Sequence, residues 1–137
     1  MYYTFDSRIR YSEIDHHRTI TLPGIINYFQ DCSTFQSETL GNGVDDMYAK
    51  GKVWVLAYWQ IEIKRLPVLG EEVTAQTWAH TFKGFQGERN YRMLDAKGSS
   101  IACANSLWIY VDLQTGHPVR VDREVQERYP MEPALEM

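Results

Sequence analysis

From residue 22 onward the spacing of hydrophobic residues changes once, from a helical period to a period of two. Apolar side chains recur every three or four positions from Leu22 to about Leu40, which predicts a long helix with Thr21 as its cap. After residue 52 apolar and polar positions alternate, as they do in strands. These strands are expected at 53–64, 72–82, 85–94 and 99–112. One helix followed by adjacent strands leaves few ways to bury the apolar faces.

The remaining segments complete the predicted architecture. We expect a first strand at 2–11, a short second helix at 44–49, and a short strand or extended tail from Pro118. Strict alternation in the strand 53–64 places Trp59 on one face and Trp54 on the other. A sheet wrapped around a central helix satisfies this order, so the prediction is an α+β hotdog fold. The whole chain, 1–137, is predicted to be a single hotdog domain. An exposed sheet edge commonly pairs with a second copy, so a homo-oligomer, a dimer or higher, is expected.

Composition excludes several classes of protein. The formal net charge of −4 disfavours a nucleic-acid binder, because such a protein needs a basic face to offset phosphate charge. The first ten residues carry charges and begin no long apolar run, so we expect neither a signal peptide nor a membrane span. A cytoplasmic location is therefore expected. Cys32 and Cys103 lack the spacing of metal ligands, so we expect no metal and no cofactor.

Several blocks of sequence resemble the first half of the acyl-acyl carrier protein (acyl-ACP) thioesterases, in the same order as in that family. They are Arg10–Asp15, Thr21–Asp31, Lys52–Leu56, Arg65–Gly70 and Ala104–Ile109. The resemblance implies a hotdog thioesterase that hydrolyses fatty acyl thioesters in fatty acid biosynthesis. Acyl carrier protein or coenzyme A would carry the substrate, and no cofactor is implied.

One motif of the family is absent. Members usually carry two hotdog domains, and the plant enzymes have a catalytic Asp-x-Asn-x-His run in the second, whereas no Asn-x-His occurs here. Either the chain is a first half, or it stands alone and a dimer replaces the second domain. A non-catalytic domain that binds the acyl chain and needs a partner for catalysis is therefore the alternative to a thioesterase.

Asp15 is the strongest catalytic candidate. It closes a Tyr11-x-Glu13-x-Asp15 run before the helix, where the related single-domain acyl-CoA thioesterases carry an Asp that attacks or activates water. The equal alternative is that Asp15 only holds its loop by hydrogen bonds. His17 could act as a general acid or base, or be an ordinary exposed residue. On an extended loop it would point away from His16, so at most one of the two faces the site.

Substrate-binding candidates lie on the helix and the strands. Backbone amides around Leu22 and Gly24, at the helix N-terminus, could stabilise an oxyanion. Asn105 shares a strand face with apolar residues, where it could bind pantetheine or satisfy a backbone group. An acyl tunnel could be walled by Trp54, Trp59, Trp78, Phe82 and Phe85 with Leu22 and Ile26, although most of these suit an ordinary core. Basic candidates for meeting the acidic carrier protein are Lys50, Lys52, Lys83, Arg89 and Arg92.

A hotdog dehydratase is a third interpretation, because Leu22-Pro23-Gly24 resembles the Pro-Gly that starts the helix in those enzymes. Dehydratases pair a loop His with an acidic residue on the helix. This chain has Asp15 near the position of the His and Phe29 near that of the acid. Hydrolysis is therefore favoured over dehydration.

Overall fold

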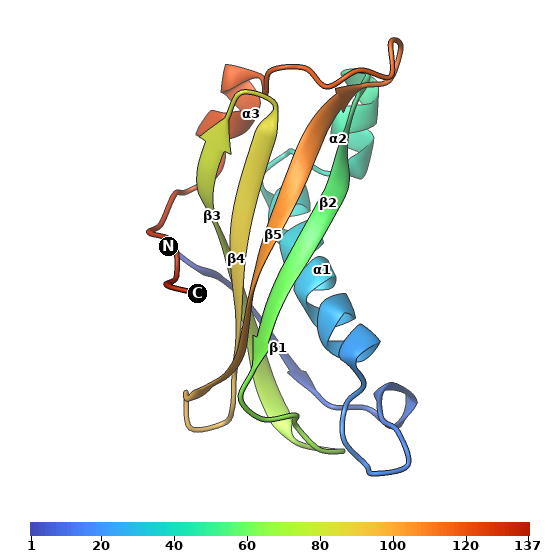
Figure 1. The fold of residues 1–137 in the computed structure, drawn as a ribbon, viewed down its shortest axis with the longest axis vertical. Coiled ribbons are helices and arrows are strands. Elements are labelled where there is room, and N and C mark those ends of the chain that lie inside the picture. The colour runs from blue at the N-terminus through green and yellow to red at the C-terminus, as the bar shows by residue number, and fades with distance from the viewer.

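In the computed structural model, which describes residues 1–137, one long helix lies across a five-stranded antiparallel sheet (Figure 1). The sheet order is β1-β3-β4-β5-β2, so the two strands that flank the long helix in sequence form the two edges. The strands are β1 (Tyr3–Arg8), β2 (Lys52–Ile63), β3 (Glu72–Lys83), β4 (Gln86–Leu94) and β5 (Ser100–Asp112). The helices are α1 (Leu22–Thr39), α2 (Val44–Ala49) and α3 (Arg123–Glu127), and Tyr11–Glu13 forms a 3-10 turn.

The predicted helices and strands are confirmed, with differences at their ends. Thr21 caps α1, because its Oγ1 accepts a hydrogen bond from the Gly24 amide at 3.1 Å. The first strand is shorter than predicted, since the chain turns at Tyr11–Glu13. The segment after Pro118 holds α3, a five-residue helix that the extended-tail prediction missed.

A β-bulge in β2 corrects the predicted faces of this strand. The pairing of β2 with β5 shifts between Leu56 and Tyr58, so the alternation of side chains reverses there. As a result Trp54 and Trp59 point to the same side of the sheet. Trp54 packs on buried Tyr110 and Trp59 on buried Tyr91, with ring centroids 4.7 and 4.9 Å apart.

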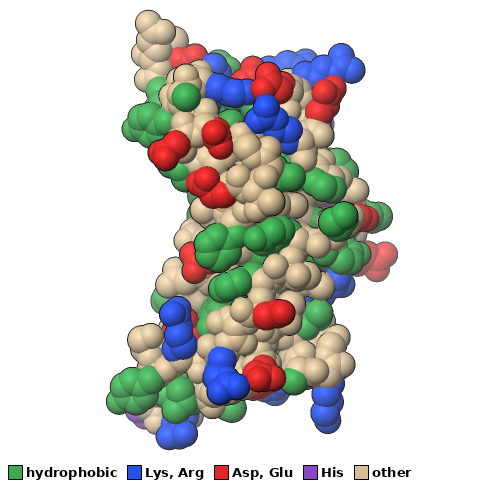
Figure 2. Space-filling model, turned by 180° about the vertical axis from the view of Figure 1, so that it is seen from behind, with side chains coloured by type: hydrophobic (Ala, Val, Ile, Leu, Met, Phe, Trp, Pro, Cys, Tyr) green, Lys and Arg blue, Asp and Glu red, His purple; other side chains and the backbone are tan.

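The two edges of the sheet differ in length and polarity. β1 has six residues and β2 has twelve, and each pairs with only one neighbour. Val55 and Tyr58 on β2 are 47% and 48% exposed. On the side opposite to that of Figure 1, hydrophobic side chains cross the middle of the molecule and charged ones gather toward its two ends (Figure 2). The long β2 edge is therefore the one suited to pairing with another sheet.

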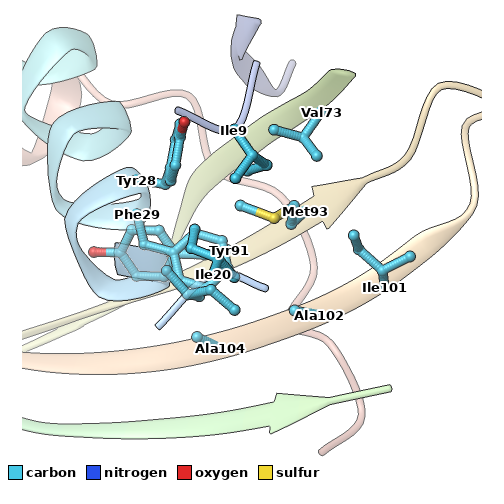
Figure 3. Close-up of a cluster of buried hydrophobic side chains, with 11 residues drawn as sticks. Ile9, Ile20, Tyr28, Phe29, Val73, Tyr91, Met93, Ile101, Ala102 and Ala104 are labelled. Atoms are coloured by element: carbon cyan, nitrogen blue, oxygen red, sulfur yellow. The ribbon is translucent and has the colours of Figure 1, made fainter. Parts of the chain in front are cut away.

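The main core lies between α1 and the sheet (Figure 3). Its eleven buried residues are Ile9, Ile20, Ile25, Tyr28, Phe29, Val73, Tyr91, Met93, Ile101, Ala102 and Ala104. Phe29 and Tyr91 are fully buried, with ring centroids 5.2 Å apart. A second, smaller cluster joins α2 and α3 to the other end of the sheet through Met47, Val125 and Tyr110. Each end of the sheet therefore has its own apolar cover.

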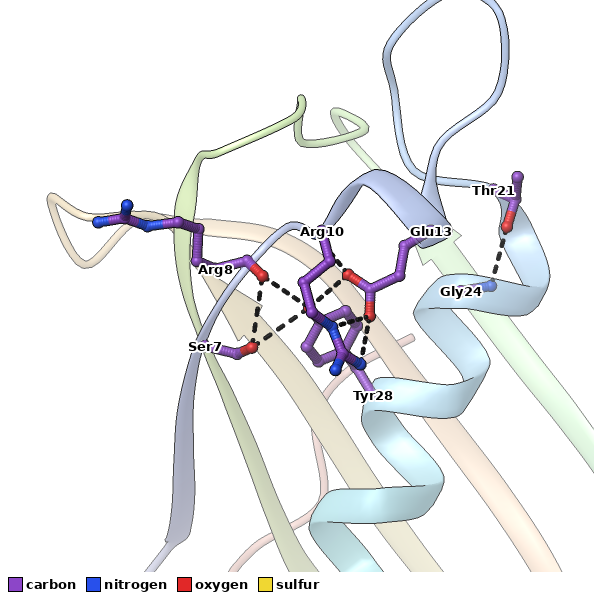
Figure 4. Close-up of polar contacts among 7 residues, drawn as sticks. All are labelled: Ser7, Arg8, Arg10, Glu13, Thr21, Gly24 and Tyr28. Atoms are coloured by element: carbon purple, nitrogen blue, oxygen red, sulfur yellow. Dashed lines mark hydrogen bonds and ion pairs between the residues drawn. The ribbon is translucent and has the colours of Figure 1, made fainter.

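A polar cluster ties the turn after β1 to α1 (Figure 4). The Tyr28 hydroxyl donates to Glu13 Oε1 at 2.7 Å, and the Arg10 amide donates to the same oxygen at 2.7 Å. Burial opposes ionisation of Glu13, but the hydrogen bonds from the Arg10 amide, the Tyr28 hydroxyl and the Arg10 guanidinium outweigh it and lower the pKa of Glu13. The turn that leads into the Asp15 loop is thus held against the helix by an ionised carboxylate.

Removal of the Tyr28 hydroxyl should destabilise the fold. Tyr28 is 4% exposed, so Tyr28→Phe leaves the Glu13 carboxylate short of a donor, and we expect a loss of about 1.5 kcal/mol in the free energy of unfolding. Urea unfolding at neutral pH measures this loss. Tyr11→Phe, at a side chain that is 82% exposed, is the control and should change stability little. Equal losses in both variants would contradict the assigned role.

The stabilisation from Glu13 should depend on pH. Because folding lowers the pKa of Glu13, its contribution is complete above the unfolded carboxyl value of about 4.3 and is lost as the pH falls through the lower folded value. The difference in unfolding free energy between the natural protein and Tyr28→Phe should therefore shrink as the pH falls below the unfolded carboxyl value and through the lower folded one. A difference that stays constant over that range would exclude the ionised pair as its source.

Candidate functional site

Asp15 lies in an exposed loop between the 3-10 turn and α1. Its Oδ1 accepts from the His17 amide at 2.9 Å and from Thr19 Oγ1 at 3.4 Å, and its own amide donates to the Thr19 carbonyl. The hydrogen bond from His17 is the largest of the effects that together lower the pKa of Asp15. The carboxylate is therefore ionised at neutral pH and holds the loop, while Oδ2 has no partner in the protein. The catalytic role of Asp15 stays a prediction.

The two loop histidines lie side by side, in contrast to the expectation that they point apart. Their ring centroids are 3.9 Å apart, because residues 16–17 form a turn instead of an extended segment. Arg18 closes this turn with a left-handed backbone, φ 65°, and its carbonyl accepts from Leu69. Both His16 and His17 are exposed, so either ring can meet a bound substrate or solvent.

The N-terminus of α1 offers fewer free amides than predicted. The Gly24 amide already donates to Thr21, and Pro23 has no N–H. Leu22 is the first residue of the helix, so its N–H has no acceptor within the helix. Gly24 also has a packing role, because a Cβ there would lie 2.8 Å from Ile20 Cγ1. The Leu22 amide is therefore the remaining oxyanion donor from this helix.

A cavity of about 190 Å³ lies at the opposite end of α1, between that helix, α2 and the sheet. Its apolar walls include Trp54, Phe82 and Trp108. Gly87 on β4 makes room for two of these rings, because a Cβ there would lie 3.1 Å from Trp54 and 3.2 Å from Phe82. Hydrophobic residues make up half of the cavity lining, and their aromatic rings offer an apolar surface for an aliphatic chain.

The cavity and the Asp15 loop are far apart within one chain. The cavity is lined on α1 by Ser33, Thr34 and Ser37, and Ser33 follows Leu22 by eleven residues, which is about 17 Å of helix. Figure 1 shows the loop and α2 at opposite ends of α1. A single copy therefore does not bring the predicted catalytic residues, Asp15 and His17, next to the cavity.

Only some of the predicted tunnel residues meet in the cavity. Trp54 and Phe82 line it. Trp59 packs against the main core instead, and Ile26, on the first half of α1, is only half-buried and lines no part of the cavity. Trp78 lies on the outer face of the sheet, where its ring packs on Tyr2. Exposed Leu22 and Phe85 also lie outside the cavity.

Asn105 lies on the face of the sheet away from α1. It is 9% exposed, and its Nδ2 donates to Glu88 Oε1 at 3.1 Å. Its Oδ1 accepts from Asn90 Nδ2 at 3.1 Å and lies 2.7 Å from His80 Nε2. Its partners in the protein are therefore side chains of β3 and β4 instead of a backbone group, and its role in binding pantetheine stays a prediction. The C-terminal segment adds to this cluster, since the Leu135 amide donates to Asn90.

Arg89 is buried, whereas it was predicted to lie on a basic surface that meets the carrier protein. Arg89 is 8% exposed, points toward α1 and lines the cavity. The sequence pattern could have indicated its burial, because Arg89 alternates along β4 with Gly87, Tyr91 and Met93, which are buried. Residues separated by an even number of positions in a strand share one face of the sheet. Arg92 is also engaged, since its guanidinium lies over the rings of Tyr2 and Trp78. Neither arginine is therefore part of the basic surface that was expected to meet a carrier protein.

The described residues include no group of three or more His, Cys, Asp or Glu side chains placed to hold a metal ion. Cys32 and Cys103 are free thiols, and burial raises the pKa of the Cys32 thiol to about 12. None of the helices is long and apolar enough to cross a lipid bilayer.

Comparison with solved structures identifies the fold. The chain superposes with a TM-score of 0.93 on a candidate oleoyl thioesterase from Lactobacillus plantarum, with 26% identity, over 100% of this chain and 54% of that one. An acyl-ACP thioesterase from Bacteroides thetaiotaomicron gives 0.91 at 22% identity, over 99% and 56%. The DHNA-CoA thioesterase from Staphylococcus aureus gives 0.83 at 21% identity, over 93% and 87%. The predicted α+β hotdog fold is thus confirmed.

Sequence comparison identifies the family. The chain is 28% identical over 138 residues to oleoyl-acyl carrier protein thioesterase 2 of Arabidopsis thaliana, covering 93% of this chain and 38% of that protein. It is 26% identical over 132 residues to an acyl-(acyl-carrier-protein) hydrolase of Cuphea viscosissima, covering 88% and 32%. The chain thus spans less than two fifths of these plant proteins. Residues 2–129 match the family described as the acyl-ACP thioesterase N-terminal domain, and the chain therefore belongs to the acyl-ACP thioesterase family.

Proposed function

We propose that this protein hydrolyses fatty acyl thioesters, with acyl carrier protein as the preferred carrier and coenzyme A as the alternative. The aromatic cavity beside Trp54, Phe82 and Trp108 carries the proposal, because it offers an apolar site for the acyl chain in a member of the acyl-ACP thioesterase family. The two free cysteines fit the reducing conditions of the cytoplasm, which we propose as its location.

The reaction needs a base or nucleophile and an oxyanion donor. In the proposed step Asp15 takes a proton from water, the water oxygen attacks the thioester carbonyl carbon, and the C–S bond breaks. The sulfur leaves with that proton as the carrier thiol, and the fatty acid is released. The Leu22 amide donates to the carbonyl oxygen while it carries negative charge, and His17 can shuttle the proton.

The distance between the Asp15 loop and the cavity favours a site completed by a second hotdog unit. We propose that two copies pair through β2, the long edge with half-exposed Val55 and Tyr58, to form a homo-oligomer. Main-chain pairing along twelve residues and burial of these side chains would stabilise the pair.

A non-catalytic acyl-binding domain is the alternative function. Two observations favour it: Asp15 is engaged in loop hydrogen bonds, and the cavity lies at the far end of α1. In this case the chain would bind the acyl group and a second domain or subunit would supply the catalytic residues.

Thiol release from acyl carrier protein and coenzyme A thioesters of several chain lengths tests the proposal. We expect turnover by the natural protein and a loss of about 100-fold or more in Asp15→Asn, because the amide cannot accept the proton. Asp45→Asn, an exposed change on α2, is the matched control and should keep full activity. Turnover that survives Asp15→Asn would remove Asp15 from the mechanism. Acyl binding without turnover by the natural protein would support the alternative.

The oligomeric state of a β2 edge variant tests the pairing. Val55→Lys/Tyr58→Lys places like charges where two β2 edges would meet, so we expect the assembly to shift toward monomer in analytical ultracentrifugation. Thr4→Lys on the short edge strand β1 is the control and should keep the assembly intact. A natural protein that is monomeric at high concentration would contradict pairing of identical copies.

A further inference from the structure

Arg89 places an incompletely used guanidinium at the wall of the cavity. The residue is 8% exposed and reaches from β4 toward α1. Its Nη1 donates to Gln36 Oε1 at 2.5 Å and to Thr77 Oγ1 at 3.1 Å. A guanidinium has five N–H donors, so the Nε donor and both Nη2 donors have no acceptor in the protein.

The charge of Arg89 also lacks a counter-ion. None of the ion pairs within 4.0 Å in this protein includes Arg89. Besides its two neutral acceptors, Gln36 and Thr77, its charge meets only the ring of Tyr129, with the guanidinium carbon 5.2 Å from the ring centroid. No fully buried side-chain nitrogen lacks a hydrogen-bond partner, so the unpartnered nitrogens of Arg89 remain accessible and an anion that enters the cavity can reach them. Such an anion would also neutralise a charge that is largely removed from water.

The free donors have the arrangement that a carboxylate requires. The Nε–H and one Nη2–H lie on one edge of the planar guanidinium and can donate in parallel to two oxygens. A dry cavity of about 150 Å³ is enough for a benzene molecule, so the cavity of about 190 Å³ holds a short aliphatic segment together with such a head group. The rings of Trp54, Phe82 and Trp108 supply the apolar walls for that segment.

We propose that this cavity binds an aliphatic carboxylate, with the Nε and Nη2 groups of Arg89 paired to its two oxygens. The inference deepens the proposed function, because it assigns a ligand class to the cavity of the acyl chain. The carboxylate has two sources: a free fatty acid, or the far end of a dicarboxylic acyl thioester. Binding requires no turnover, so this proposal and the proposed hydrolysis can fail separately.

Binding of octanoate and 1-octanol to the natural protein and to Arg89→Gln tests the proposal. The two probes share chain length and differ in charge, and Trp54 and Trp108 in the cavity wall give a fluorescence readout alongside calorimetry. We expect octanoate to bind the natural protein about tenfold or more tighter than 1-octanol, and the preference to vanish in Arg89→Gln. Equal affinities in the natural protein, or a preference that persists in Arg89→Gln, would overturn the assignment.

Two further variants keep the test valid if Arg89→Gln does not fold. Arg89→Lys retains the charge without the planar fork, so the preference for octanoate should fall but stay above unity. Val44→Trp adds bulk at an exposed position of the cavity lining and should weaken both probes equally. Octanoate binding that is unaffected by both variants would place the anion site elsewhere and overturn the proposal.

Comparison of octanoyl-CoA with octanedioyl-CoA distinguishes the two sources of the carboxylate. Tighter binding of octanedioyl-CoA, lost in Arg89→Gln, would support entry of the far end of a dicarboxylic chain. A preference seen with free octanoate alone would support a site for the free fatty acid. Affinities for octanoate and for octanedioyl-CoA that are both unchanged in Arg89→Gln would show that Arg89 does not select the ligand and would overturn the proposal.

Discussion

Burial of one face of α1 against the sheet is the interaction on which the rest of the structure depends. Phe29 and Ile25 of this helix are fully buried, and Phe29 meets Tyr91 at the centre of the sheet. No second long helix is available to cover this face, so loss of the Phe29 ring would cost about 3–5 kcal/mol, a large part of the stability of a domain of this size. The Thr21 cap and the contact between Glu13 and Tyr28 set where the helix begins and how the chain enters it.

The cover provided by α1 is incomplete at its C-terminal end, and this gap defines the candidate site. The helix ends at Thr39, and α2 and α3 close the far end of the sheet with a separate, smaller cluster. The cavity lies where the helix, α2 and the sheet meet, and the buried Arg89 borders it. At this point Arg89 and Gln36 form a polar contact where the rest of the helix has apolar packing. Placing a charged side chain there lowers the stability of the fold, and a bound ligand would offset that loss.

Sequence periodicity predicted the elements well because it reports local backbone geometry. The helix from Leu22, its Thr21 cap and the short helix Val44–Ala49 follow from spacing and turn residues alone. The faces of β2 could not be predicted in the same way. Its bulge depends on the register with β5, about fifty residues further along the chain, and one unpaired residue reverses the direction of every later side chain.

The sequence by itself determined the order of elements, the family resemblance and the candidate carboxylate, Asp15. Only the tertiary structure decided that Trp54 faces the cavity, that Asn105 lies on the opposite face of the sheet, and that Arg89 is buried without a counter-ion. The physical reason is that burial and facing are properties of pairs of distant segments. A strand pattern shows which side chains share a face, but the packing of α1 and α2 decides which face becomes a core, a cavity or a surface.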